Sequence, residues 1–195
     1  MYNCNNENIS VFIKGAVWME RKLIQEINLL ENKKLVMNLN IVAIAIVLIL
    51  TVLGIVFSGG FAITNGFMGI IWMFGGYAVA IVIHEAVHGI FFKAFRPEAK
   101  VKFGFKNGMA YAGSPGAFYT KAQFFIISIA PFIVLTGLFI FLRFLGVNEA
   151  VLYLIFALHT SGCVGDFYYC ILLINQPAGI VVEDTDKGIN FYSEG

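Results

Sequence analysis

Two histidines and a glutamate stand close together at residues 84–88, in the pattern His-Glu-x-x-His. On a helix His84 and His88 are one turn apart and share a face, so both imidazoles can ligate a zinc ion. Glu85 then lies beside the metal, where its carboxylate can act as a general base. The chain has three histidines in all, and two of them fall in this motif. The pattern predicts a centre for metal-assisted hydrolysis.

The motif lies in an apolar stretch. Residues 35–84 contain no Asp, Glu, Lys or Arg, so Glu85 is the first charged residue after Lys34. Ionisable groups in a membrane span are costly and are therefore functional-site candidates. Hydrophobic residues make up 59% of the chain and charged residues 13%, against roughly 45–50% and about 25% in soluble domains. The composition predicts a polytopic membrane protein embedded in a lipid bilayer. The net charge of +1 gives no reason to expect a nucleic-acid partner.

The order of apolar and polar runs predicts a mainly α-helical membrane protein with about four transmembrane helices. Each run is near or above the roughly 20 residues needed to cross a bilayer. The expected spans are about 40–57, 67–92, 122–142 and 150–174. We expect three parts, namely an N-terminal cytoplasmic or interfacial segment, a transmembrane metalloprotease-like domain and a cytoplasmic tail, at residues 1–38, 39–175 and 176–195.

The N-terminal segment carries a weaker pattern. Between Val17 and Leu30 apolar residues recur at helical spacing, with charged residues among them. This spacing predicts an amphipathic helix at the membrane surface.

The distribution of Lys and Arg predicts the orientation. Five precede the first span, six lie in residues 93–121, and none lies in loop 58–66. By the positive-inside rule, both termini and the loop 93–121 face the cytoplasm. We therefore expect an integral membrane protein with both termini cytoplasmic, and the family resemblance described below implies a bacterial cytoplasmic membrane.

The loop after the second span has a pattern of its own. Residues 100–106 alternate polar and apolar, Asn107-Gly108 follows, and a second short run reaches residue 112. Asn-Gly between such runs predicts a β-hairpin at about 100–112, on the cytoplasmic side. Tyr111 and Tyr119 are the nearest candidates to stabilise an oxyanion, although packing aromatics are the other interpretation.

A zinc site needs a third protein ligand besides the two histidines. At ~1.5 Å per residue, His84 and His88 lie ~13 and ~7 Å inside the end of their span. Asp166 lies ~13 Å inside the matching end of the fourth span, whereas His159 lies ~24 Å inside. Asp166 is therefore the predicted third ligand of one Zn²⁺ per chain, and His159 is a candidate for contact with a ligand or for packing.

Several neighbours leave alternatives open. Cys163 shares a helical face with Asp166 and is a further ligand candidate. The tail acids at 183, 184 and 186 could reach the site, but solvated surface charges are the commoner explanation. Gly162 and Gly165 permit close helix packing or local unwinding near Asp166.

The motifs together resemble a known family. They are His84-Glu85-x-x-His88-Gly89, Ala130-Pro131-Phe132 and Gly165-Asp166. This set is similar to a bacterial family of membrane zincin peptidases, itself distantly similar to site-2 proteases, the zinc intramembrane metalloproteases. The resemblance covers nearly the whole chain. It implies zinc held by His84, His88 and Asp166, with Glu85 catalytic.

One departure limits what the resemblance implies. Site-2 proteases carry an Asn-Pro element and Leu-Asp-Gly near the last ligand, whereas this chain has Gly-Asp-Phe at 165–167. The enzyme class is therefore better supported than the substrate.

Three functions remain to be compared. The first is an intramembrane zinc endopeptidase that cleaves membrane-anchored proteins. The second is a di-iron lipid hydroxylase or desaturase, which would need many more than three histidines. The third is a non-catalytic membrane protein, such as a pseudoprotease that binds substrate or a transport or assembly subunit. The oligomeric state is open.

Overall fold

The computed structural model describes residues 8–11, 19–58, 67–106 and 109–194. The helices in these ranges are α1 (Lys33–Ser58), α2 (Phe67–Phe95), α3 (Lys121–Phe144), α4 (Glu149–Gly162) and α5 (Val164–Asn175). The strands are β1 (Asn8–Val11), β2 (Met19–Ile27), β3 (Lys102–Lys106), β4 (Met109–Gly113), β5 (Phe118–Thr120), β6 (Ile180–Asp184) and β7 (Ile189–Glu194).

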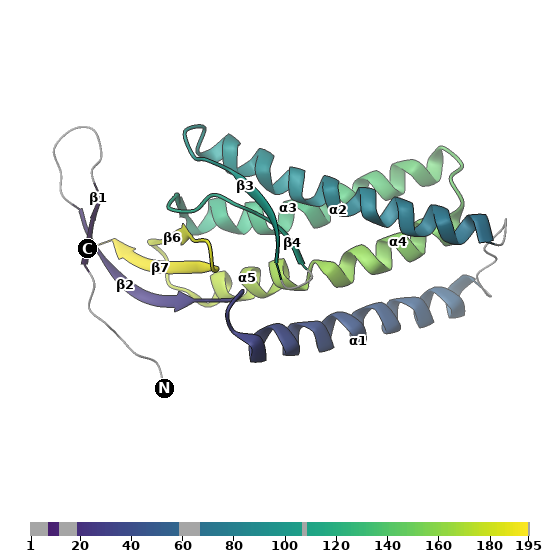
Figure 1. Cartoon of the computed structure of the whole chain (residues 1–195), viewed down its shortest axis with the longest axis horizontal. Coiled ribbons are helices and arrows are strands. Elements are labelled where there is room, and N and C mark those ends of the chain that lie inside the picture. Colours follow the sequence, from purple (N-terminus) through teal and green to yellow (C-terminus); the bar gives the residue numbers. More distant parts are fainter. Residues whose placement is uncertain (1–7, 12–18, 59–66, 107–108, 195) are drawn as a thin grey trace.

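The helices run alongside one another, and most of the strands gather at one end of them (Figure 1). Five strands form an antiparallel sheet in the order β1-β2-β7-β6-β5. The pairing of β2 with β7 joins the two terminal parts of the chain. β3 and β4 form a separate two-stranded sheet beside the helices (Figure 1).

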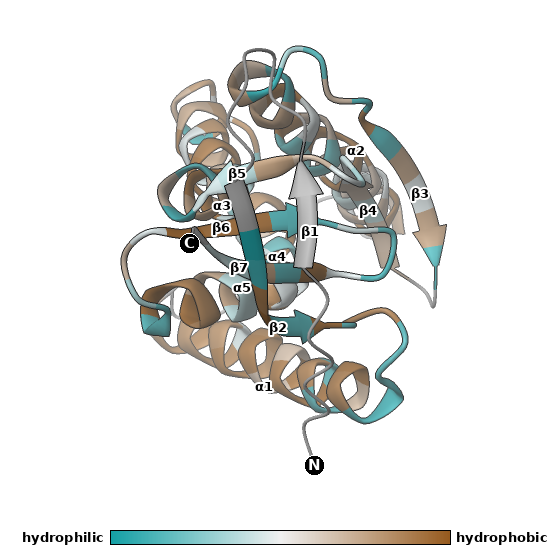
Figure 2. Cartoon of the chain, turned by 90° about the vertical axis from the view of Figure 1, so that its left-hand side faces the viewer, coloured by the Kyte–Doolittle hydropathy of each residue, from teal (hydrophilic) through white to brown (hydrophobic). Residues whose placement is uncertain are grey.

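The expected mainly helical membrane architecture is confirmed in its coarse form. α1, α2 and α3 are each long and apolar enough to cross a membrane. Much of the length of these helices is coloured hydrophobic in Figure 2, and many of their large apolar side chains are exposed, which suits contact with lipid. α4 and α5 pass the same test only as a pair, and they meet at an angle of 48°.

The break between α4 and α5 falls where the sequence places two glycines. Gly162 ends α4, Cys163 separates the helices, and Gly165 lies in the first turn of α5. A break in a span is tolerated where the backbone is surrounded by protein rather than lipid. The consequence is that Asp166 lies in the first turn of a new helix, in the interior of the bundle.

The predicted amphipathic helix near the N-terminus is wrong for residues 19–27. These residues form β2, in which Arg21 and Ile27 are buried while Ile24 is 41% exposed. Burial alternates with a period of two along the strand, as expected when one face packs. Helical spacing gave the wrong answer because the partner that decides the conformation, β7, lies at the other end of the chain.

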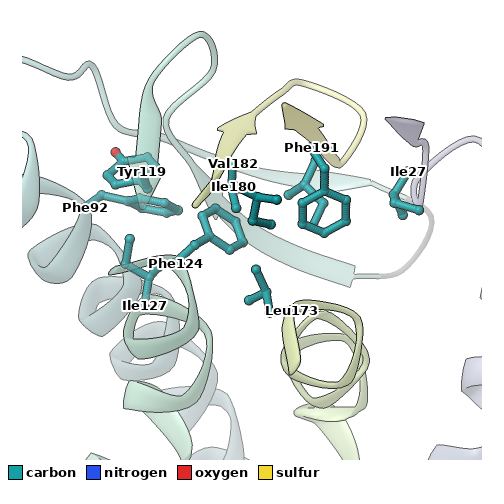
Figure 3. Close-up of a cluster of buried hydrophobic side chains, with 10 residues drawn as sticks. Ile27, Phe92, Tyr119, Phe124, Ile127, Leu173, Ile180, Val182 and Phe191 are labelled. Atoms are coloured by element: carbon teal, nitrogen blue, oxygen red, sulfur yellow. The ribbon is translucent and has the colours of Figure 1, made fainter. Parts of the chain in front are cut away.

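A buried apolar cluster fixes the sheet to the helix ends (Figure 3). The sheet contributes Tyr119, Val182 and Phe191, and the helices contribute Phe92, Phe124 and Leu173, with others. Aromatic rings make much of this contact, including Phe92 against Tyr119 at 5.5 Å between centroids. Burial of this size is a large stabilising term. The strands that border the candidate site are therefore held in position by the same buried cluster that packs around the last turns of α2.

The β3–β4 hairpin pairs Lys102 with Gly113 and Lys106 with Met109. The expected turn residues Asn107 and Gly108 lie outside the described residues. Gly89 of α2 lets the hairpin approach, because a Cβ there would lie 2.7 Å from the Phe103 ring. β4 consequently lies against α2 beside the His-Glu-x-x-His motif.

Gly188 provides a test of the sheet. A Cβ at this position would overlap the carbonyl oxygen of Ile27, and the backbone φ is +156°. We expect Gly188→Ala to separate the β6–β7 turn from the end of β2 and to cost about 2–3 kcal/mol. The measurement is thermal unfolding in detergent.

Gly137→Ala in α3 is the matched control, since a Cβ there meets nothing within 4 Å. It should leave the melting temperature nearly unchanged. An equal loss in both variants would contradict the assigned packing of Gly188.

Candidate metal centre

Two helices meet at the candidate metal centre. α2 presents His84 and His88 from successive turns, with ring centroids 4.8 Å apart. α5 presents Asp166, whose Oδ2 lies 3.2 Å from His84 Nε2 and whose Oδ1 lies 3.3 Å from His88 Nε2. The structure therefore brings together the three residues that the depth argument selected.

The donor set fits a zinc ion. Two nitrogens and a carboxylate oxygen all lie within 4.8 Å of one another. Ligand atoms on one tetrahedral zinc lie ~3.3–3.4 Å apart, because each bond is ~2.0–2.1 Å long. The observed nitrogen–oxygen distances of 3.2 and 3.3 Å match that spacing.

The other ring nitrogens of the histidines are occupied. His88 Nδ1 lies 2.9 Å from the carbonyl oxygen of Ile127 in α3, and a carbonyl can only accept. His88 therefore donates its Nδ1 proton to this carbonyl, and its Nε2 atom faces the Asp166 carboxylate. His84 Nδ1 lies 3.1 Å from His159 Nε2. Such contacts orient metal-binding imidazoles.

His159 and Cys163 lie behind His84. The Cys163 Sγ is 3.6 Å from His159 Nε2 and 3.9 Å from His84 Nδ1. These three side chains form a second group with suitable ligand atoms within 4.8 Å. His159 is 3% exposed, and its Nδ1 has no hydrogen-bond partner within the described residues. His84 thus belongs to both groups. Its Nε2 atom faces Asp166, and its Nδ1 atom faces His159 and Cys163.

Glu85 lies on α2 next to the two histidines and borders the same cleft. Its carboxylate accepts a hydrogen bond from the Ala112 backbone N–H of β4. The Oε2 atom has no hydrogen-bond partner among the residues that the structure covers. This oxygen is buried, and a buried carboxylate oxygen without a partner is costly, which marks Glu85 as a candidate functional group.

The cleft at this centre has a volume of about 400 Å³. His84, Glu85, His88 and Asp166 form one side. The other sides come from α1, the β4 strand and the turn between β6 and β7. The cleft is large enough for a short stretch of extended peptide, since ligand pockets start at about 300 Å³.

The two tyrosines have different surroundings. Tyr111 lines the cleft, so it can approach a bound ligand. Tyr119 is fully buried, and its hydroxyl lies 2.7 Å from Ser114 Oγ. The packing interpretation therefore applies to Tyr119.

Asp184 is a buried residue of this region that the sequence does not single out. It is 7% exposed, although its neighbours in an acidic run suggest a solvated charge. The Ser114 N–H donates to its Oδ2, and the Ser114 hydroxyl lies 3.4 Å from the same oxygen. These contacts fix the end of β4 to the sheet. No motif signals this role, because it depends on two segments 70 residues apart.

The pKa of Asp184 predicts a pH dependence of stability. Burial raises this pKa to about 7, while the hydrogen bonds from Ser114 and the charge of His88 act in the opposite direction. A raised acid pKa favours the protonated folded state, so its stability contribution is lost as pH rises towards 7. Between pH 5 and pH 8 the loss should be about 2–3 kcal/mol.

Asp184→Asn should remove that dependence, so the variant should gain stability relative to wild type at pH 8 but not at pH 5. The melting temperatures of wild type and variant are measured at pH 5 and at pH 8. Because the two proteins share all other titrating groups, the effects of those groups cancel in the difference between wild type and variant. Asp186→Asn is the control, because Asp186 is a mostly exposed neighbour paired with Lys102. A difference that is independent of pH would contradict the buried-charge explanation.

Comparison with known proteins adds one finding. The family described as "Putative zincin peptidase" matches residues 77–181, more than half of the 195-residue chain. No curated protein and no solved structure gives a significant match. The matched range contains the whole His84–Asp166 centre, and a zincin family implies zinc and a metallopeptidase. The chain therefore belongs to the zincin peptidase family.

Proposed function

We propose that the protein is an intramembrane zinc metallopeptidase, similar to the site-2 proteases, that hydrolyses peptide bonds of membrane-anchored proteins. One observation carries the proposal. His84, His88 and Asp166 converge within helices apolar enough to span a membrane, with Glu85 beside them. Ionisable groups at such a depth need a function or a partner that offsets their cost.

The proposed zinc ligands are His84 and His88 through Nε2 and Asp166 through its carboxylate, with one ion per chain. Zinc in such a site polarises a carbonyl group and lowers the pKa of water to about 7. Three protein ligands leave a fourth position open, as in other catalytic zinc sites.

Glu85 is the proposed general base and acid. The Ala112 N–H holds one part of its carboxylate, and Oε2 is buried beside the two histidines with no protein partner in the described chain. Glu85 would take a proton from the attacking water on Oε2 and deliver it to the leaving amine. The anchor on β4 matters because a base must stay within hydrogen-bond reach of the water.

His159 is proposed to position His84. With His84 Nε2 directed at the metal, the proton is on Nδ1 and donates to His159 Nε2, 3.1 Å away. His159 then carries its own proton on Nδ1. Cys163, next to both rings, packs against this pair. The role is that of a positioning residue and not of a fourth ligand.

β4 is the proposed docking strand for substrate. It pairs with β3 along one edge, and Met109–Gly113 line the cleft. An extended peptide added to an exposed strand edge would present its amide bonds unwound, as hydrolysis requires. Transmembrane helices must lose their helical hydrogen bonds before an amide is accessible.

We propose that both termini and the sheet face the cytoplasm of a bacterial cell. The Lys and Arg distribution supports this orientation. The pairing of β2 with β7 adds support, since it puts both terminal segments at one end of the bundle. The alternative to an enzyme is a non-catalytic membrane protein that uses the same cleft to bind a partner.

Metal content tests the ligands. Purified wild type, never exposed to chelators, should contain about one zinc per chain, whereas His84→Ala and Asp166→Ala should lose it. Elemental analysis by mass spectrometry gives the ratio. Glu149→Gln, at the far end of α4, is the control and should retain zinc. Full zinc retention in a His84→Ala/His88→Ala double variant would exclude this site.

Glu85→Gln separates the enzyme from the binding protein. It should keep zinc and lose about 10²–10⁴-fold in cleavage, because the amide cannot accept the proton. Membrane proteomes of cells with wild type or the variant should differ by uncleaved substrates that accumulate. Identical profiles would favour the non-catalytic alternative.

A further inference from the structure

A second hollow lies apart from the metal centre, with a volume of about 330 Å³. It is bordered by the segment after α2 and the segment before α3, and we call it the arginine pocket. Arg21, Arg96, Lys100, Glu98 and Phe118 line it. It shares Pro115 alone with the lining of the metal cleft. The zinc proposal does not use it.

Arg21 is the unusual residue of the arginine pocket. Its side chain is 7% exposed, and its Nε and Nη1 atoms have no hydrogen-bond partner among the residues described. The guanidinium lies 4.6 Å from the centre of the Phe118 ring. This stacking offsets part of the cost of burial, but it leaves two N–H donors without a hydrogen-bond partner among the described residues. A buried cation is normally paired with an anion.

The shape of the sheet brings Arg21 to this place. β7 and β6 stand between β2 and β5, yet Arg21 of β2 stacks on Phe118 of β5. β2 has a register shift between Leu23 and Gln25, and such irregularities bend a strand. The first part of β2 stays paired with β7 beyond this irregularity, and there the Arg21 side chain reaches the Phe118 ring.

Arg96 also contacts Phe118. Its Nε–H donates to the Phe118 carbonyl oxygen at 2.8 Å, which fixes the guanidinium plane. Lys100 adds a third positive charge, and Glu98, which is exposed, is the one acidic residue in the lining. Three cations against one carboxylate make the pocket electropositive. Two fixed guanidinium groups suit the tetrahedral oxygens of a phosphate.

The location indicates where the phosphate comes from. Arg96 directly follows α2, and Phe118 lies three residues before α3 begins. Helices of this kind leave the apolar layer at their ends, so the pocket lies at headgroup depth. Basic pockets on the cytoplasmic side of membrane proteins bind anionic lipid headgroups.

We propose that the arginine pocket binds a phosphate group, through Arg21 and Arg96, on an anionic lipid headgroup or as a free ion. The proposal does not rest on the zinc site, so either can fail alone. Binding there would neutralise Arg21 and join β2 to β5. Phosphate would thereby stabilise the sheet that carries Asp184 and borders the metal cleft.

The test uses the full chain in a phosphate-free detergent. Native mass spectrometry with added phosphatidylglycerol should show one tightly retained lipid per chain, and a glycolipid of equal chain length without phosphate should not be retained. Separately, inorganic phosphate should raise the melting temperature above that in sodium chloride of equal ionic strength. Retention of the lipid against excess inorganic phosphate identifies a headgroup site, whereas a phosphate shift without lipid retention identifies a free-ion site.

Variants assign the binding to the pocket. Arg21→Gln and Arg96→Gln should each weaken binding at least tenfold, and Glu98→Gln should strengthen it. Lys106→Gln is the control, because it removes a positive charge from the nearby hairpin outside the pocket and should change affinity less than twofold. Arg96→Gln keeps the test available if Arg21→Gln does not fold.

Three outcomes would overturn the proposal. The first is that neither phosphate probe binds to wild type. The second is that binding persists unchanged in the Arg21→Gln/Arg96→Gln double variant. The third is that an acidic peptide binds while both phosphate probes fail, which would make the pocket a peptide site.

Discussion

The cost of placing charged groups in an apolar layer is the constraint on which this structure depends. Asp166 lies within hydrogen-bond distance of both His84 and His88, in helices that present apolar faces to their surroundings. An aspartate at this depth is tolerable when opposite charge or a metal compensates it. Asp166 therefore has to lie next to His84 and His88, and this determines where α5 begins relative to α2. The rest of the fold holds the two helices in that arrangement.

The candidate metal centre is held in place by residues that contact its three members. The Ile127 carbonyl and His159 occupy the outer nitrogens of the two histidines, which fixes the directions of the inner ones. The break at Cys163 lets α5 take a direction different from α4, so that Asp166 reaches the histidines. β4 is held at Ala112 by Glu85 and beyond its end by Asp184. The sheet therefore controls the side of the cleft that faces Glu85.

Local and distant information contributed differently to what the sequence could predict. The spans and the hairpin follow from patterns within about 25 residues, and the structure has three helices apolar enough to span a membrane, a bent pair α4–α5 and the β3–β4 hairpin. β2 was mistaken for a helix because its conformation depends on β7, and Asp184 looked like a surface acid because Ser114 covers it from another segment. The depth argument favoured Asp166 over His159 as a ligand because it treated the fourth span as one helix of constant rise, whereas the chain breaks at Cys163 between the two residues. The same argument could not reveal that His159 contacts His84, because sideways distances depend on how helices pack.

The sequence by itself determined the chemistry that this protein can offer. It names two imidazoles and a carboxylate at helical spacing in an apolar run, and no fold changes the identity or the linear spacing of those groups. The tertiary structure alone decided which ring nitrogen faces Asp166, which acid is buried and which arginine is buried against an aromatic ring. Those properties arise from contacts between residues far apart in the chain, and their energies depend on burial that exists only after the chain has folded.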